Sequence, residues 1–377
     1  MSHIIDRVSL IVGLFFGVIL LHYFVTQLDT SLKFDELALG EGSSVNLASM
    51  NGVKVHCYDL VDAQQCLEGY TKVLGSLPVV LWLGNSQVHA INQMKSGDET
   101  AVPELYRRLV DNGHYLLTFS QPDANFQEHF LLFHYLLDQI PVKTLVMPVV
   151  FDDMRNTDIR ASLVDALKDD SVSVRLAKTK TGQILLANNS DQDAAGNDMS
   201  ALEDTVQEAS EKWLNAKMNK FQIWSERPTL RNHALLSLYR LRNWVLGINP
   251  STERRMLPGS YALNRQALKA MLNEAKDRDI QVLVYVVPLR NDVPIPYNAA
   301  EYSSFKADMQ ALSVSQGAHF INLENLVPAK YWGTKNSTSI GGEQELDFMH
   351  FAAGGHGLLA NALYRELQAL QIIDNNP

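Results

Sequence analysis

The stretch Leu77-Pro78-Val79-Val80-Leu81-Trp82-Leu83-Gly84-Asn85-Ser86-Gln87 is the segment from which the organisation of this chain is read. Residues 79–83 are an apolar run of strand length that ends abruptly in Gly-Asn-Ser, and residues 88–95 indicate the start of a helix. A serine at such a turn points outward, and the neighbouring backbone N–H groups point the same way, toward any anion that forms there. Ser86 is therefore a candidate nucleophile for acyl transfer; the alternative is that it only caps the helix.

Apolar segments of strand length alternate with helical segments on both sides of this turn. Further strands are predicted at residues 114–119, 143–150, 280–287 and 319–323. Helices are predicted at residues 102–112, 125–139, 156–168, 263–278, 301–316 and 355–370. This alternation predicts an α/β fold, a five-stranded parallel sheet with helices on both faces, of the SGNH or flavodoxin-like kind. Ligands of such sheets bind beyond the carboxyl ends of the strands.

The chain divides into three parts. We expect residues 1–26 to form a cytoplasmic tip and a transmembrane signal anchor, residues 27–76 a stalk and entry segment, and residues 77–377 the α/β domain. The rhythm breaks at about residues 170–260, which read as a helical insertion with a loop near residue 190.

The N-terminal anchor rests on residues 8–25, VSLIVGLFFGVILLHYFV, which carry no formally charged side chain. Eighteen residues lie at the short end of the length that spans a bilayer. Arg7 precedes the run and acidic residues follow it, so the positive-inside rule keeps the N-terminus in the cytoplasm. A cleaved signal peptide is the rival, but no small-x-small site follows. We expect a single-pass protein of the inner (cytoplasmic) membrane, with its C-terminal domain in the periplasm or outside the cell.

Composition limits the other functions. The net charge of −10 and the pI of about 5.6 argue against nucleic-acid binding. Cys57 and Cys66 are nine positions apart. In an exported domain they form either a disulfide or two half-buried thiols. No nearby cysteine or histidine cluster completes a zinc site, so we expect no metal and no cofactor.

A second signal, Asp347 and His350, lies near the C-terminus. The two residues are three positions apart, and on a loop or single turn the carboxylate reaches one imidazole nitrogen while the other faces outward. A hydrolytic triad needs this arrangement, in which the acid orients the base that takes the serine proton. The alternative is a surface Asp–His pair beside a helix cap. His356 is a rival base, without a carboxylate partner in its Gly-His-Gly setting.

Taken together, Gly84-Asn85-Ser86 after the first strand and Asp347 with His350 before the last helix resemble the SGNH (GDSL-like) hydrolase superfamily. The resemblance covers roughly residues 77–370 and implies a triad of Ser86, His350 and Asp347. The family places a glycine after strand two and Gly-x-Asn-Asp after strand three as oxyanion donors. This chain has Ser120-Gln121-Pro122-Asp123-Ala124-Asn125 and Phe151-Asp152-Asp153-Met154-Arg155-Asn156 there instead.

These divergent loops leave several candidate oxyanion donors. Asn125, Arg155 and Asn156 are candidates, and each is alternatively a helix cap or a solvated loop residue. The backbone N–H groups of Ser86 and Gln87 are further candidates. Arg290, which follows the fourth strand, is placed to bind a phosphate, carboxylate or sugar, or else to form an exposed salt bridge.

With its divergent middle loops and its anchored, exported domain, this chain resembles the membrane-tethered branch of the SGNH superfamily. That branch contains the D-alanyl transfer protein of teichoic acid synthesis (DltD) and the alginate O-acetylation proteins. This resemblance implies a membrane-bound O-acyltransferase (MBOAT) partner and a glycan or other cell-envelope polymer as substrate. We therefore predict a serine O-acyltransferase or esterase. A tethered esterase of the soluble type is a second interpretation, and a catalytically silent scaffold or glycan-binding subunit is a third.

Overall fold

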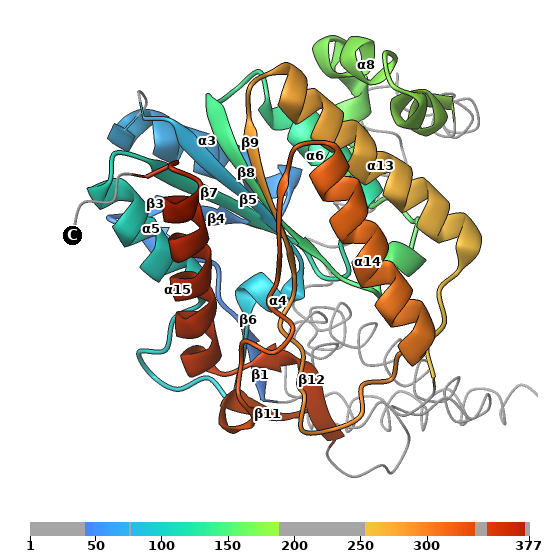
Figure 1. Cartoon of the computed structure of the whole chain (residues 1–377). Helices are drawn as coiled ribbons and strands as arrows, with labels where there is room; N and C mark the ends of the chain where they lie inside the picture. The colour runs from blue at the N-terminus through green and yellow to red at the C-terminus, as the bar shows by residue number, and fades with distance from the viewer. Residues whose placement is uncertain (1–41, 75–76, 188–252, 336–344, 374–377) are drawn as a thin grey trace, which may run out of the picture. The chain divides into compact units, whose positions relative to one another are not determined.

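A sheet of six parallel strands forms the centre of the fold (Figure 1) in a computed structural model that describes residues 42–74, 77–187, 253–335 and 345–373. The strand order is β10-β9-β8-β5-β7-β4, and every neighbouring pair is parallel. The strands are β4 (His56–Cys57), β5 (Val79–Gly84), β7 (Tyr115–Ser120), β8 (Val142–Val149), β9 (Gln281–Val286) and β10 (His319–Asn322). The α/β class and the parallel sheet are confirmed.

The predicted number of five strands is wrong, because β4 is a sixth. It is two residues long and pairs with β7, so it is too short to produce a periodic pattern. Residues 43–57, expected in the stalk and entry segment, contribute four short strands: β1 (Ser43–Val45), β2 (Ser49–Met50), β3 (Val53–Lys54) and β4.

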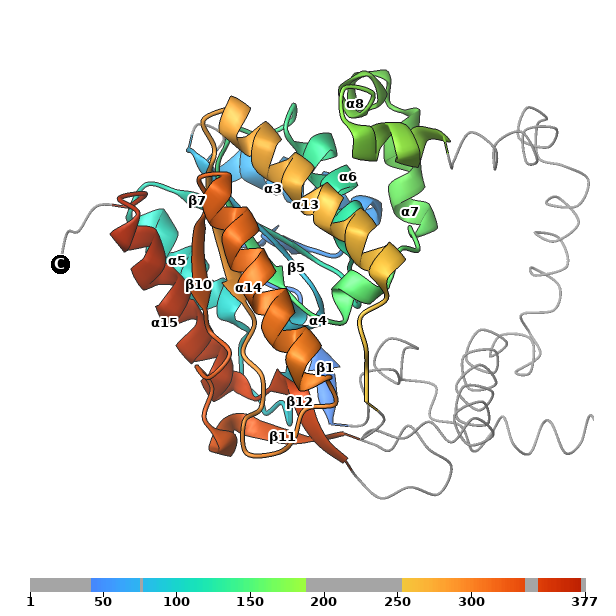
Figure 2. The ribbon, with the colours of Figure 1, turned by 45° about the vertical axis from the view of Figure 1, so that its right-hand side comes forward.

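Helices cover both faces of the sheet, which is why strands such as β5 are apolar and buried along their whole length. α5 (Ala101–Asp111) packs against α15 (Ala353–Ala369), and α6 (Phe126–Leu136) packs against α13 (Pro258–Asp277). The two pairs lie on opposite sides of the sheet in Figure 1, and α14 (Ala299–Ser315) runs beside α13 in Figure 2. α3 (Leu60–Leu74) contacts β3, β4 and β7.

Two predicted helices are shorter than expected. The helix predicted from residue 88 is only α4 (Ser86–His89), because the chain turns into β6 (Ala90–Asn92), which pairs antiparallel with β1. The helix predicted at residues 156–168 is also wrong in its first part. Asn156 accepts a bond from the backbone N–H of Asp158, and this local turn competes with the helix. Helical structure resumes in α7 (Ala161–Val164), a 3-10 turn η2 (Asp165–Lys168) and α8 (Asp170–Leu176).

The segment that carries Asp347 and His350 is a strand rather than the expected loop or single turn. It is β12 (Glu345–Phe351), and it pairs antiparallel with β11 (Trp332–Lys335) through an irregular register. The paired residues are between 10 and 19 positions apart, so no local pattern predicts the pairing.

The two cysteines form a disulfide. Cys57 at the end of β4 is joined to Cys66 in α3, with Cα atoms 6.3 Å apart. The sequence left open a disulfide or two half-buried thiols, and the structure has the disulfide.

Several predicted segments lie outside the described residues: the span at residues 8–25, the loop near residue 190 and the part of the helical insertion up to residue 252. Within the described ranges, no helix combines the length and the apolar character that crossing a bilayer requires.

The strand order has a switch point between β5 and β8. From β5 the chain moves outward to β7 on one side, and it then returns past β5 to β8 on the other side. The loops that follow β5 and β8 therefore separate above the sheet, where ligands of open α/β sheets bind.

Candidate active site

Ser86 lies at this switch point, as the first residue of α4. Asn85 is extended and caps the helix, since its Oδ1 accepts from the backbone N–H of Gln87 at 3.1 Å. A Cβ at Gly84 would lie 2.5 Å from Cγ2 of Val88, so the glycine allows the helix to fold closely over the end of the strand. The turn presents Ser86 with 7% of its surface exposed.

One imidazole ring joins Ser86 to Asp347. His350 Nε2 lies 3.0 Å from Ser86 Oγ, and His350 Nδ1 lies 3.0 Å from Asp347 Oδ2. With Nδ1 protonated, the ring donates to the carboxylate, and Nε2 is free to accept the serine proton. The structure therefore brings together the three residues that the sequence selected as nucleophile, base and orienting acid.

Asp347 is held by further donors. Its Oδ1 accepts from the backbone N–H groups of Met349 and His350, at 2.9 and 3.0 Å, and its Oδ2 accepts from Asn92 Nδ2 at 3.2 Å. Burial alone would raise the pKa of the Asp347 carboxyl, but the charge and hydrogen bonds of His350, together with the charge of Lys335, bring it below its ordinary value. The acid is thus ionised at neutral pH. Asn92 was not selected from the sequence, because β6 forms only through its pairing with β1.

Gln87 connects α4 to the strand that carries His350. Its Nε2 donates to the carbonyl oxygens of Pro288 and Met349, both at 2.8 Å. Its backbone N–H donates to Asn85, so both donors of this candidate oxyanion residue already have acceptors. Gln87 therefore fixes the distance between the serine turn and β12.

The candidates in the loops after β7 and β8 take the cap and loop roles that the sequence left as alternatives. Asn125 caps α6 in a capping box, and its Nδ2 donates to Asp158 O at 2.8 Å. Arg155 donates to Arg255 O and to Asp152, at 2.8 and 3.1 Å. Asn156 Oδ1 accepts the Asp158 turn bond.

Arg290 is 8% exposed and forms a two-pronged salt bridge with Asp292 at 2.7 and 3.0 Å. Its Nη1 donates to Gly333 O at 2.9 Å. The guanidinium thus holds β11 in place. The sequence left an exposed salt bridge as the alternative role of Arg290; the salt bridge is present, but its arginine side is buried.

His356, the rival base, is bonded elsewhere. It is fully buried and its Nε2 donates to Ala90 O at 3.1 Å, which anchors β6. Burial lowers the pKa of His356 to about 4, so the ring is neutral.

A buried serine and two histidines form a hydrogen-bonded group that joins α4 to β4 and β7. Ser120 Oγ lies 2.6 Å from His56 Nε2 and 2.7 Å from His89 Nδ1. A hydroxyl has one proton, so Ser120 donates to one ring and accepts from the other. Burial, with His350 nearby, lowers the pKa of His89 to about 3. This group was missed, because its members are spread over β4, α4 and β7.

Asn85 also bonds to the loop across the switch point. Its Nδ2 donates to Asp153 Oδ2 at 3.0 Å. Asp153 begins the 3-10 turn η1 (Asp153–Arg155) directly after β8 and is 5% exposed. The sequence drew attention to this loop but not to Asp153, because a lone acidic residue there has no distinguishing pattern.

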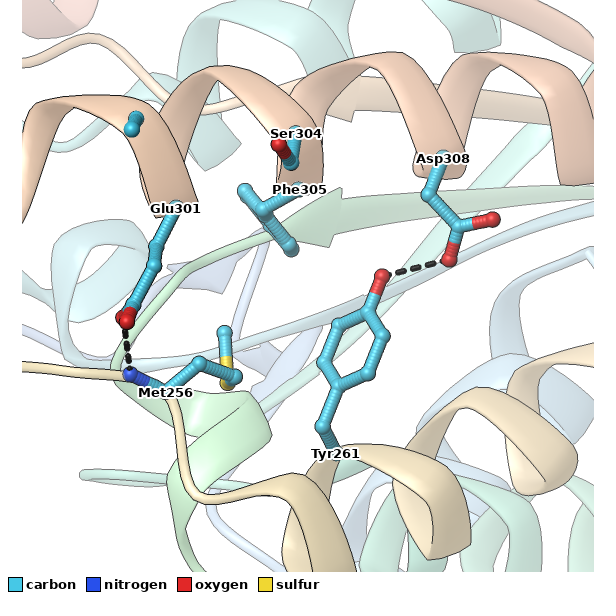
Figure 3. A pocket seen from close by; sticks show the side chains of 7 residues that line it. Met256, Tyr261, Glu301, Ser304, Phe305 and Asp308 are labelled. Atoms are coloured by element: carbon cyan, nitrogen blue, oxygen red, sulfur yellow. Dashed lines mark hydrogen bonds between the residues drawn. The ribbon is translucent and has the colours of Figure 1, made fainter.

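The part of the chain that the structure describes contains no group of three or more His, Cys, Asp or Glu side chains placed to hold a metal ion. A pocket of about 360 Å³ lies between α13 and α14, lined in part by Tyr261, Phe305 and Asp308 (Figure 3). No triad residue lines this pocket, so it is separate from the Ser86 site.

No family model and no curated protein matches this chain. Solved structures similar to it include TesA, at 13% identity over 78% of this chain and 99% of that chain, with a TM-score of 0.38. A GDSL-like lipase from Bacteroides thetaiotaomicron is similar at 9% identity over 83% of this chain and 100% of that chain, with a TM-score of 0.39. These scores are low, so the fold and function of this chain rest on its own geometry.

Proposed function

We propose that this chain is a serine enzyme of acyl transfer, in which Ser86 is the nucleophile, His350 the general base and Asp347 its orienting acid. The observation that carries the proposal is the single imidazole bonded to the serine on one nitrogen and to a buried carboxylate on the other. The alternative, a surface Asp–His pair, does not explain why Asp347 is buried, with 1% of its surface exposed, or why it accepts an additional bond from Asn92.

The proposed reaction has two halves. Ser86 Oγ attacks an acyl carbonyl while its proton moves to His350 Nε2, and the carbonyl electrons move to the oxygen. Collapse of this adduct breaks the bond to the leaving group, which takes the proton from His350. An acceptor hydroxyl or water then loses its proton to His350 and attacks the acyl-enzyme, which regenerates Ser86. Asp347 stabilises the imidazolium in both halves.

The setting of this reaction is part of the proposal. The apolar run at residues 8–25 supports a membrane anchor, and the Cys57–Cys66 disulfide supports an oxidising compartment outside the cytoplasm. Tethering would raise the local concentration of the enzyme near a cell-envelope polymer, which favours an O-acyltransferase beside an MBOAT partner over a free esterase.

Covalent labelling tests the triad directly. A serine-directed fluorophosphonate should label the wild-type protein but not the Ser86→Ala and His350→Ala variants. Ser304→Ala is the matched control, because Ser304 lines the pocket between α13 and α14, apart from the triad. Equal labelling of all four proteins would reject the proposal.

Two further experiments separate the remaining interpretations. If polymer acylation in cells continues unchanged with Ser86→Ala, the chain is a scaffold or binding subunit instead. Rapid Ser86-dependent cleavage of p-nitrophenyl acetate without any acyl transfer to a glycan would favour the esterase. A C-terminal alkaline-phosphatase fusion should be active if the domain is exported, and an expressed but inactive fusion would contradict export.

A further inference from the structure

The short strand β1, by which the chain enters the α/β domain, pairs with the strand that follows the nucleophile helix. β1 runs antiparallel to β6, with Ser43 opposite Asn92 and Val45 opposite Ala90. Among the described strands β6 is its only partner, because the two form a sheet of their own. Both strands lie near α4, at one end of the central sheet (Figure 1). The segment predicted as anchor and stalk precedes β1 in the sequence, so the chain passes along β6 directly after it.

The backbone bonds between β1 and β6 fall at alternate positions. The N–H of Asn46 donates to His89 O at 2.8 Å, which ties the residue after β1 to the end of α4. Hydrogen-bonded pairs recur at every second position of an antiparallel ladder, so Ser44 exchanges both of its backbone bonds with Ile91. Ser44 is therefore the residue of β1 whose N–H the pairing uses, directly beside the last residue of β6.

That last residue, Asn92, connects β6 to the triad. Its Nδ2 donates to Asp347 Oδ2 and to Thr334 O, both at 3.2 Å. A Cβ at Gly333 would collide with Asn92 Oδ1, so the amide fits closely against β11. The side chain is fully buried. The position of β6 therefore decides whether this amide reaches the carboxylate that orients His350.

We propose that β1 is a positioning element of the acyl-transfer site: while it is paired with β6 it holds Asn92 against Asp347, and its release lowers turnover. This inference rests on the proposed function. A pairing of two strands is only marginally stable by itself, so β1 belongs to the parts of a fold that open locally at low cost in free energy. Because the predicted anchor and stalk precede β1, a partner that pulls on them would reach the catalytic base through this pairing.

The first experiment compares two serine-to-proline variants of the full chain. Ser44→Pro removes the N–H that the pairing uses, and kcat for p-nitrophenyl acetate should fall about threefold to tenfold with KM nearly unchanged. Activity should not vanish, because His356 still donates to Ala90 O at 3.1 Å. Ser49→Pro is the control, since Ser49 is exposed on β2, which pairs with β3. Equal kcat values for the two variants would overturn the inference.

A double variant provides a readout that general loosening of the fold would not produce. If β1 acts through Asn92, the losses caused by Ser44→Pro and Asn92→Ala are not additive. The double variant should then keep kcat within about threefold of Asn92→Ala alone. A loss equal to the product of the two single losses would overturn the inference, because β1 would then affect turnover by another route.

A cross-strand disulfide tests whether the pairing itself is what matters. Val45 and Ala90 face each other as a non-hydrogen-bonded pair, whose short Cα separation suits a disulfide. Adding Val45→Cys and Ala90→Cys to Ser44→Pro should return kcat to within about twofold of wild type, once mass spectrometry confirms the bridge. No recovery in the bridged protein would contradict the inference. The bridged protein also replaces Ser44→Pro if that variant alone does not fold.

A measurement without turnover separates this inference from the proposed function. In protein labelled with ¹⁵N in the histidine rings, the resonances lost in His350→Ala identify the base. They should shift in Ser44→Pro in the same direction as in Asn92→Ala, because both changes disturb the bond to Asp347. Unshifted resonances would refute the role of β1 even if Ser86 labels normally with the fluorophosphonate. Shifted resonances in a protein whose Ser86 never labels would support the positioning role and contradict the proposed function.

Discussion

Asn92 donates from Nδ2 to the same carboxylate oxygen of Asp347 that bonds to His350, at 3.2 and 3.0 Å respectively. The same amide also donates to Thr334 O at 3.2 Å, so Asn92 connects β6 to both β11 and β12. The orientation of His350, the proposed catalytic base, therefore depends on a short strand that is distant from it in sequence.

Replacing Asn92 should impair catalysis without abolishing it. Asn92→Ala removes one bond to a charged oxygen, and we expect kcat to fall about tenfold, or about 1.4 kcal/mol, with KM nearly unchanged. Steady-state hydrolysis of p-nitrophenyl acetate measures the change. Asn361→Ala, which removes a bond within α15, is the control that should leave kcat intact. A change confined to KM would contradict a role for Asn92 in orienting the base.

Gly84→Ala should destabilise the fold because of the contact with Val88. The added Cβ would lie 2.5 Å from Val88 Cγ2, and overpacking of this kind costs about 1–3 kcal/mol. Denaturant unfolding measures the loss. The double variant with Val88→Ala should recover part of it, because the smaller side chain vacates the space that the Cβ needs. Purely additive losses would show that the clash is not with Val88.

Acid should destabilise the protein through its buried histidines. Burial lowers the pKa values of His129 and His134 to about 3, against the 6.5 of an unperturbed histidine. In the unfolded chain these two rings bind protons below about pH 6.5, whereas in the folded state they remain neutral down to about pH 3. The contribution of these neutral rings to the free energy of unfolding is fully present above pH 6.5. It declines as the pH falls through this window, by about 1.4 kcal/mol per pH unit for each such ring.

His134→Phe tests this explanation at one ring. Both ring nitrogens of His134 are buried without partners among the described residues, and the ring packs against Phe130. The apolar replacement should leave the Tm less dependent on pH between 4 and 6.5 than the wild-type Tm, in thermal unfolding followed by circular dichroism. An identical pH dependence in the two proteins would contradict the assignment.

The disulfide between β4 and α3 should stabilise the folded protein. Closing a loop of nine positions between Cys57 and Cys66 is worth about 2–3 kcal/mol in the chain-entropy treatment. The double variant Cys57→Ala, Cys66→Ala should lose that amount in denaturant unfolding. Reductant should destabilise the wild type but not the variant, and equal sensitivity of the two would reject the bridge.

The sequence predicted the parts of this fold that depend on local pattern. β5, β7, β8 and β9 are apolar runs that alternate with helices, so the parallel sheet and the position of Ser86 at the end of a strand could be inferred. β4 and β6 could not, because each has only two or three residues and pairs with a strand far along the chain. β12 could not, because it forms through its irregular pairing with β11.

The same distinction applies to the site. Ser86, His350 and Asp347, which the structure brings together, could be selected because each is a chemically distinctive residue beside a predicted element boundary. Asn92 and Asp153 could not be selected, because their bonds to Asp347 and Asn85 exist only in the folded chain. Gln87 was selected for its backbone N–H, and its side-chain bonds to Pro288 and Met349 could not be read from its position in the sequence.

The long separation of the triad has a consequence for biosynthesis. Ser86 and His350 are 264 positions apart, and β12 must pair with β11 before the ring can face the serine. A growing chain therefore presents an inert hydroxyl until residue 350 has been synthesised and placed. Contacts this distant in sequence form slowly, so the proposed reactivity toward acyl groups would arise late in the folding of the domain.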